Sequence, residues 1–146
     1  ATEALLKSKA VFNFATHFYY KNTNLRDLDN FKLSEHLFKE FTNFLKTDTT
    51  FVTQEEKLFK KAYLASAQQN ILTEYSDIKE KLFVAKIAEI SKNKDIITPT
   101  LKAEILQRYF YKEGVYAYHL KNDTTISNAL NLLKDTAAYN KILSGN

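Results

Sequence analysis

Apolar residues recur along this chain at intervals of three or four positions, which places them on one face of an α-helix. Each such run is separated from the next by a short polar break. The positions that define the successive stripes are Leu5, Leu6, Phe12, Ala15, Phe18 and Tyr19; Leu37, Phe38, Phe41, Phe44 and Leu45; Ile78, Leu82, Phe83, Ile87 and Ile90; Leu101, Ile105, Leu106, Tyr109 and Phe110; Ile126, Ala129, Leu130 and Leu133; and Ala138, Tyr139, Ile142 and Leu143. The pattern predicts a succession of amphipathic helices, the first of them over residues 3–21.

Two cap signals mark the starts of the second and third helices. Ser34 can accept a hydrogen bond from the first turn of the second helix. The stretch "TQEE" that begins at Thr53 is a capping box, in which the Thr53 hydroxyl and the Glu56 carboxylate each bond the other residue's backbone N–H. The third helix is expected to extend to about residue 74.

Polar residues mark further boundaries. The stretch "KNTNLRDLDNFK", residues 21–32, is rich in Asn, Asp and Thr, whose side chains compete with the backbone for hydrogen bonds, so it is predicted to be a loop. Ser76 or Asp77 can cap the fourth helix, and Asp123 can cap the short helix near the end.

Thr98 followed by Pro99 predicts the start of the fifth helix, because proline is favoured at the first helical position. This helix is expected to continue through Gly114 to about residue 120, with glycine allowing another backbone to approach closely. In the alternative, Gly114 ends the helix as a left-handed cap.

The composition agrees with an all-α fold. With 2 Gly and 1 Pro among 146 residues, the chain is poor in the residues that tight turns require. Its length is that of one domain, and 45% hydrophobic residues suffice for a core. We therefore predict a single all-α domain over residues 1–146, with about six or seven helices.

Charge and special residues narrow the function. The net charge of +4 is small and spread along the chain, which argues against a concentrated nucleic-acid footprint. There is no cysteine, so neither disulfides nor thiolate chemistry are expected. Methionine is absent even at position 1, from which we expect the chain to be part of a longer protein.

No pattern in the chain predicts a catalytic, cofactor or metal site. A phosphate-binding loop needs several neighbouring glycines, whereas Gly114 and Gly145 stand far apart. No serine is flanked by the glycines of a nucleophile elbow. His17, His36 and His119 are widely separated, with no zinc-binding spacing between them. We predict no catalytic residue, no cofactor and no metal ligand.

The stretch "RYFYKEG", residues 108–114, is the most conspicuous in the chain. Arg108 could bind an anion, but we favour a structural role in which its guanidinium bridges helices and stacks on aromatic rings. Tyr109 and Phe110 are expected to pack in the core. The alternative is a stacking platform for bases, formed by tyrosines facing water beside a basic groove; its members would be Tyr19, Tyr20, Tyr109, Tyr111, Tyr116 and Tyr118.

Three segments together resemble a known family. They are "SKAVFNFATHFYYKN" (8–22), "FKLSEHLFKEFTNFLK" with "FVTQEEKLFKKA" (31–62), and "LKAEILQRYFYKEGVYAYHLKNDTTISNALNLLKDTAAYNKIL" (101–143). This chain resembles the C-terminal region of carboxyl-terminal processing, or tail-specific, peptidases, in particular the larger Bacteroidetes-type forms. The most specific part is R-Y-F-Y-x-x-G with the Asp, A-L-x-L-L and Y-x-x-I-L that follow.

The resemblance implies a parent serine peptidase of the cell envelope or periplasm, with a Ser–Lys dyad and a PDZ domain upstream of residue 1. No serine or lysine here matches those catalytic motifs, so the chain is expected to be non-catalytic. It would support the peptidase core, shape access of a protein or peptide substrate, or mediate self-association as a homo-oligomer. Its partners would be the parent's own peptidase and PDZ domains, with no nucleic acid. The alternatives are a free-standing helical module that binds nucleic acid, and an adaptor that binds another protein.

Overall fold

A computed structural model of the chain describes residues 1–25, 27, 31–66 and 72–144. The described part contains eight helices and no strand, so the all-α prediction is confirmed. The helices are α1 (Thr2–Lys7), α2 (Ala10–Lys21), α3 (Glu35–Phe44), α4 (Gln54–Ser66), α5 (Leu72–Lys92), α6 (Lys94–Asn122), α7 (Thr124–Lys134) and α8 (Thr136–Leu143).

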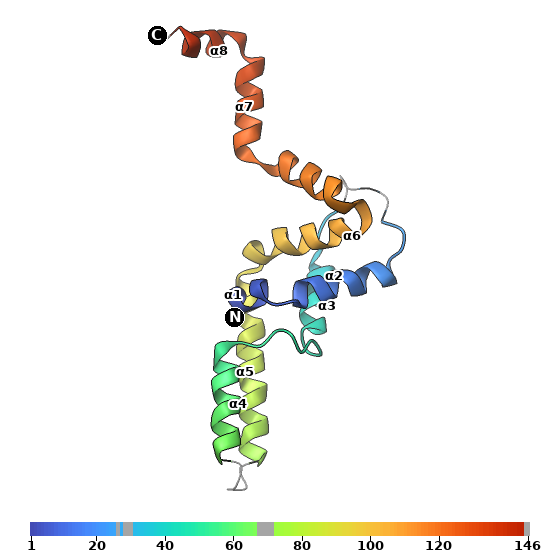
Figure 1. The fold of residues 1–146 in the computed structure, drawn as a ribbon, viewed down its shortest axis with the longest axis vertical. Helices are drawn as coiled ribbons and strands as arrows, with labels where there is room; N and C mark the ends of the chain where they lie inside the picture. The colour runs from blue at the N-terminus through green and yellow to red at the C-terminus, as the bar shows by residue number, and fades with distance from the viewer. Residues whose placement is uncertain (26, 28–30, 67–71, 145–146) are drawn as a thin grey trace.

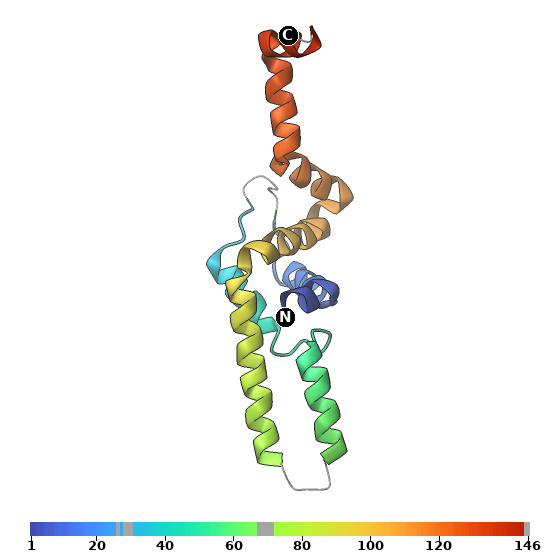
Figure 2. The same ribbon diagram turned by 90° about the vertical axis from the view of Figure 1, so that its left-hand side faces the viewer.

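The helices form three parts of an elongated molecule (Figure 1). A central body contains α1, α2, α3 and the first part of α6. At one end, α4 and α5 lie side by side and form an arm. At the other end, α7 and α8 form a tail that extends away from the body. The view turned by 90° shows the same three parts (Figure 2).

The core of the molecule lies in the body, where α2 packs along α6. Aromatic rings join α2 to α3: the Phe14 ring centroid lies 5.1 Å from that of Phe41 and 5.5 Å from that of Phe44, both edge to face. Such geometry suits the ring quadrupoles. Leu101 and Ile105 of α6 are fully buried one turn apart. These rings fix the position of α3 against α2.

The first predicted helix is divided into α1 and α2, which raises the number of helices from the expected six or seven to eight. Ser8 is the cause: its hydroxyl donates to Leu5 O at 2.7 Å and accepts from the Ala10 N–H at 3.1 Å. Its backbone is extended, with ψ 171°. A serine side chain that bonds nearby backbone groups competes with the helix, and here α1 ends at Lys7, just before this serine.

Hydrogen bonds confirm two of the predicted helix caps, Ser34 and Asp123. The Ser34 hydroxyl accepts from the Leu37 N–H at 3.1 Å. The Asp123 carboxylate accepts from the N–H groups of Thr125 and Ile126 at the start of α7. The loop predicted over residues 21–32 is non-helical from Asn22 onward where it is described; residues 26 and 28–30 lie outside the described residues.

The arm begins its return helix earlier than predicted. Ser76 and Asp77 do not cap α5 but lie inside it, and the expected extension of the third helix to residue 74 is wrong because α5 begins at Leu72. Tyr75 explains the difference. Its ring stacks on Phe59 of α4, with centroids 5.0 Å apart and planes at 10°. Packing between the two arm helices outweighs the local cap preference.

The predicted start of the fifth helix at Pro99 is also wrong. α6 begins at Lys94, with only Asn93 between it and the end of α5, and Pro99 lies inside it. Burial of Ile97 favours the earlier start, because that residue and Leu101 lie one turn apart on the core side. Pro99 lacks an N–H and removes one helical hydrogen bond. The Thr98 hydroxyl is buried with no hydrogen-bond partner in the described part of the chain.

α6 continues past Gly114 to Asn122, so Gly114 is not a left-handed cap. The helix nevertheless changes direction sharply within its length, as both ribbon views show (Figures 1 and 2). The change occurs at Tyr111, whose φ is 54° and ψ −156°. Glycine favours this region, and another residue held there is strained by about 1–3 kcal/mol. This bend was not predicted.

Candidate functional site

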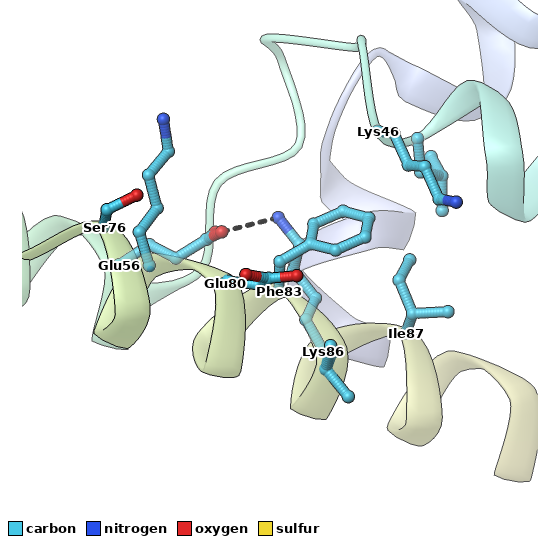
Figure 3. Close-up of a pocket in the computed structure, with 10 residues that line it drawn as sticks. Lys46, Glu56, Ser76, Glu80, Phe83, Lys86 and Ile87 are labelled. Carbon is cyan, nitrogen blue, oxygen red and sulfur yellow. Dashed lines mark hydrogen bonds and ion pairs between the residues drawn. The ribbon is translucent and has the colours of Figure 1, made fainter.

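A cleft lies where the arm joins the body, and it could take a ligand or a side chain of a partner. Its volume is about 700 Å³. The α3 end, the first turn of α4 and one face of α5 surround it, as the close-up shows (Figure 3). The lining residues are Leu45, Lys46, Glu56, Ser76, Lys79, Glu80, Phe83, Val84, Lys86 and Ile87.

Lys86 is the unusual residue of this cleft, because it is a lysine with only 7% of its surface exposed. Its ammonium group donates to Phe51 O at 3.1 Å and to Glu56 Oε1 at 2.7 Å. Its Nζ also lies 4.3 Å from the centroid of the Phe51 ring. A buried charge is tolerated only when paired and hydrogen-bonded, and these contacts meet that condition.

Glu56 connects this ion pair to the start of α4. One carboxylate oxygen, Oε2, accepts from the Thr53 N–H at 2.8 Å, and the Glu56 N–H donates to the Thr53 hydroxyl at 3.3 Å. The other oxygen accepts from Lys86 (Figure 3). The capping box thus shares its carboxylate with α5, so a single side chain both starts the arm and fixes its two helices together.

The chemistry available in the cleft is that of binding. Its floor is apolar, formed by residues such as Phe83 and Ile87, and its rim carries Lys46, Lys79 and Glu80. Such a surface can hold an apolar side chain with polar groups around it. Among the described residues, no three His, Asp or Glu side chains gather as a metal site, and no helix is long and apolar enough to cross a bilayer.

Arg108 lies in the body, away from this cleft, and connects α6 to α2. Its guanidinium donates to Phe12 O at 3.1 Å and to the Thr16 hydroxyl at 3.2 and 3.3 Å. It also pairs with Glu104 at 2.6 Å and lies 4.2 Å from the Phe12 ring centroid. The planar guanidinium makes all these contacts at once, which the single ammonium of a lysine could not.

Tyr109 and Phe110 are half-buried and pack against the core. The Tyr109 hydroxyl donates to Asn22 O, and its ring lies 5.0 Å from Tyr19. Burial, followed by the proximity of Tyr19, raises the pKa of Tyr109. Gly114 is buried within α6. Of the sequence-predicted residues, Glu56 lines the cleft and is hydrogen-bonded to Thr53. Arg108, Tyr109, Phe110 and Gly114 lie along α6.

The other tyrosines of the possible stacking platform occupy two environments. Tyr19 and Tyr118 are half-buried, like Tyr109. Tyr20, Tyr111 and Tyr116 are exposed, with 76%, 74% and 65% of their surfaces accessible.

The tail presents a second surface. Its apolar residues remain largely exposed: Leu133 by 61%, Ile142 by 63% and Leu143 by 68%. Among the described residues of α7 and α8, none is buried. On α7, Ile126, Leu130 and Leu133 share one face at helical spacing. Together these residues form an exposed apolar face on α7.

Lys86 was missed from the sequence, although a signal was present. It lies four residues after Leu82 and four before Ile90, within an apolar stripe. Residues four apart share a face of a helix, so a lysine at that position must either extend out to water or be buried with a partner. Its partner lies thirty residues earlier, which periodicity alone could not identify.

These features define an all-α domain with a helical body, a cleft at the joint between body and arm, and an exposed apolar tail. A family model described as "Probable PDZ-protease, C-terminal helical domain" matches residues 1–133. The chain therefore belongs to this family of protease-associated C-terminal helical domains, in agreement with the resemblance noted from its sequence. Searches of the curated proteins and of the solved structures found no match.

Proposed function

We propose that this chain is the non-catalytic C-terminal domain of a serine-type, carboxyl-terminal processing endopeptidase, and that it docks onto the parent's peptidase and PDZ domains. The exposed apolar face of α7 carries the proposal. Leu130 and Leu133 share this face and are exposed to water in the isolated domain. The domain belongs to a family described as the C-terminal part of a protease, so the rest of the protease could cover this face. An apolar face of this kind is typical of a contact surface.

The cleft at the base of the arm supports the same proposal. Its apolar floor and charged rim suit a side chain from a neighbouring domain or from an unfolded substrate. By docking, the domain would support the peptidase core and shape the access of substrate to it. The parent's Ser–Lys dyad would perform the hydrolysis, in the cell envelope or periplasm, and the domain itself would need neither a cofactor nor nucleic acid.

The first test is on the parent protease, in which Leu130→Glu and Leu133→Glu are combined. Charges on this face should prevent docking, so we expect peptidase activity on an unstructured C-terminal peptide to fall at least about tenfold. Asn128→Glu with Asn131→Glu is the matched control, since these residues lie on the other side of α7. Equal activity of the two double variants would contradict docking through α7.

The second test uses the 146-residue chain alone. We expect no hydrolysis of the same peptide at any enzyme concentration that gives complete cleavage by the parent. Activity that persists through purification would exclude a non-catalytic role. Salt-sensitive binding of DNA or RNA by the chain alone would instead favour a nucleic-acid module, because binding through phosphates weakens steeply as salt is added.

A further inference from the structure

The bend in α6 is a strained point between two well-formed helical segments. Tyr111 is the only non-glycine residue with positive φ in the described part of the chain. Helical structure extends on both sides of it, from Lys94 and as far as Asn122. A strained residue in such a position persists only where surrounding contacts hold it.

Those contacts cross the bend. Lys102 Nζ lies 4.7 Å from the centroid of the Tyr118 ring, a cation–π contact between the two segments of α6. In a straight helix these two residues would lie about 24 Å apart along the axis, beyond the reach of both side chains. Tyr118 also packs against the core. The contact therefore exists only in the bent form.

Other features destabilise the bent form of α6. Burial, and then the positive charges of Lys121 and Lys32, lower the pKa of Lys102. Lys121 follows the bend whereas Lys102 precedes it, so bending brings like charges together. Straightening would also return Tyr111 to helical angles that suit a tyrosine. Favourable contacts and opposing strain thus act on the same bend.

We propose that α6 is a two-state element in which the bent helix seen here exchanges with a straight helix from Lys94 to Asn122. The Lys102–Tyr118 contact holds the bent state, and relief of the Tyr111 backbone favours the straight one. Because α7 begins two residues after α6 ends, the exchange moves the whole tail relative to the body. A partner that binds the tail in one orientation therefore selects one state of α6.

The absence of cysteine from these 146 residues allows a direct test by spin-label distances on the whole chain. Thr100→Cys and His119→Cys place labels at exposed positions on either side of the bend. In a straight helix these positions are about 28 Å apart along the axis, and the bent form must be shorter. We expect two distance populations in the otherwise unchanged chain.

Three further substitutions in this labelled chain assign the populations. Tyr111→Gly should raise the ratio of short to long distances roughly tenfold, because glycine adopts positive φ without strain and is a poor helix former in the straight state. Tyr111→Ala retains a Cβ and should change the ratio less than about threefold. Tyr118→Ala removes the contact across the bend and should shift the population toward the long distance. A single distance that neither Tyr111→Gly nor Tyr118→Ala changes would overturn the proposal.

Discussion

The body and the tail are built from amphipathic helices of similar pattern, yet they bury their apolar residues to very different extents. In the body, Phe14, Phe41 and Leu101 are enclosed by neighbouring helices. In the tail, Leu133 and Ile142 have the same helical spacing to other apolar residues but remain mostly in water. Amphipathic pattern therefore predicts that a helix has an apolar face, while only the surrounding helices decide whether this domain covers that face itself.

The difference between body and tail should be largest in the response to removal of one apolar side chain. Phe41→Ala leaves a cavity in the body, and we expect the free energy of unfolding to fall by about 3–5 kcal/mol. Leu133→Ala should change it by less than about 0.5 kcal/mol, because that side chain is already exposed. Urea denaturation of both variants checks this. Similar losses for the two would mean that the tail folds as part of the core.

The second prediction is that the joint between arm and body contributes to the stability of the domain almost as strongly as the core does. Glu56→Ala removes both the cap of α4 and the counter-charge of buried Lys86, so we expect a loss of about 3 kcal/mol. Gln54→Ala, in the same turn but outside the ion pair, should cost less than about 0.5 kcal/mol. Thermal and urea unfolding provide the measurement. A Glu56→Ala variant as stable as the original would show that the arm is energetically independent.

A third prediction concerns the connection between α2 and α6. Arg108→Lys keeps the charge but loses the planar donors that contact Phe12 O, Thr16 and Glu104. We expect a loss of about 1–2 kcal/mol in the free energy of unfolding. Lys112→Ala, an exposed basic residue after the bend, is the control and should have almost no effect. If Arg108→Lys left the free energy of unfolding unchanged, the alternative that Arg108 binds an anion would be favoured.

The smallest expected effect is a dependence on pH at Asp48, in the segment that leads from α3 to the arm. Burial raises the pKa of this carboxyl, but hydrogen bonds from Asn13, Thr50 and the Phe51 N–H outweigh it, and the pKa lies below its ordinary value of 3.8. A depressed pKa means that the folded state favours the carboxylate. Its contribution is therefore complete above about pH 5 and is lost as the pH falls through the depressed pKa.

Asp48→Asn tests this contribution. The variant should be about 1 kcal/mol less stable at pH 7 and should lose less stability than the original chain between pH 5 and pH 2. Urea unfolding at a series of pH values measures both effects. Parallel pH curves for the two proteins would exclude Asp48 as the source.

The fold was predictable from the sequence where local signals and packing agree. Ser34 and Asp123 start helices as their side chains predict, because nothing in the tertiary structure opposes those caps. Thr98 and Ser76 carry equally good local signals, but burial of Ile97 and the stacking of Tyr75 start the helices earlier. The predicted helix boundaries were wrong where contacts between residues distant in sequence outweigh a capping hydrogen bond.

The candidate site was less predictable than the fold. Thr53 and Glu56 were identified from the capping box, since four consecutive residues contain the whole pattern. Their connection to Lys86 depends on the hairpin that brings α5 beside α4, and the strain at Tyr111 depends on contacts between two ends of one helix. Neither is encoded in a short stretch of residues.

The connection between α5 and α6 has a mechanical consequence for the parent protein. Only Asn93 separates these two helices, and its side chain donates to Glu89 O at 3.0 Å, while the Ile96 N–H donates to Asn93 O at 3.1 Å. Because this joint is one residue long and is hydrogen-bonded to both helices, it has little freedom to twist. We therefore expect the arm and the first part of α6 to move together, so that a displacement of the arm would also displace the helix that carries the tail.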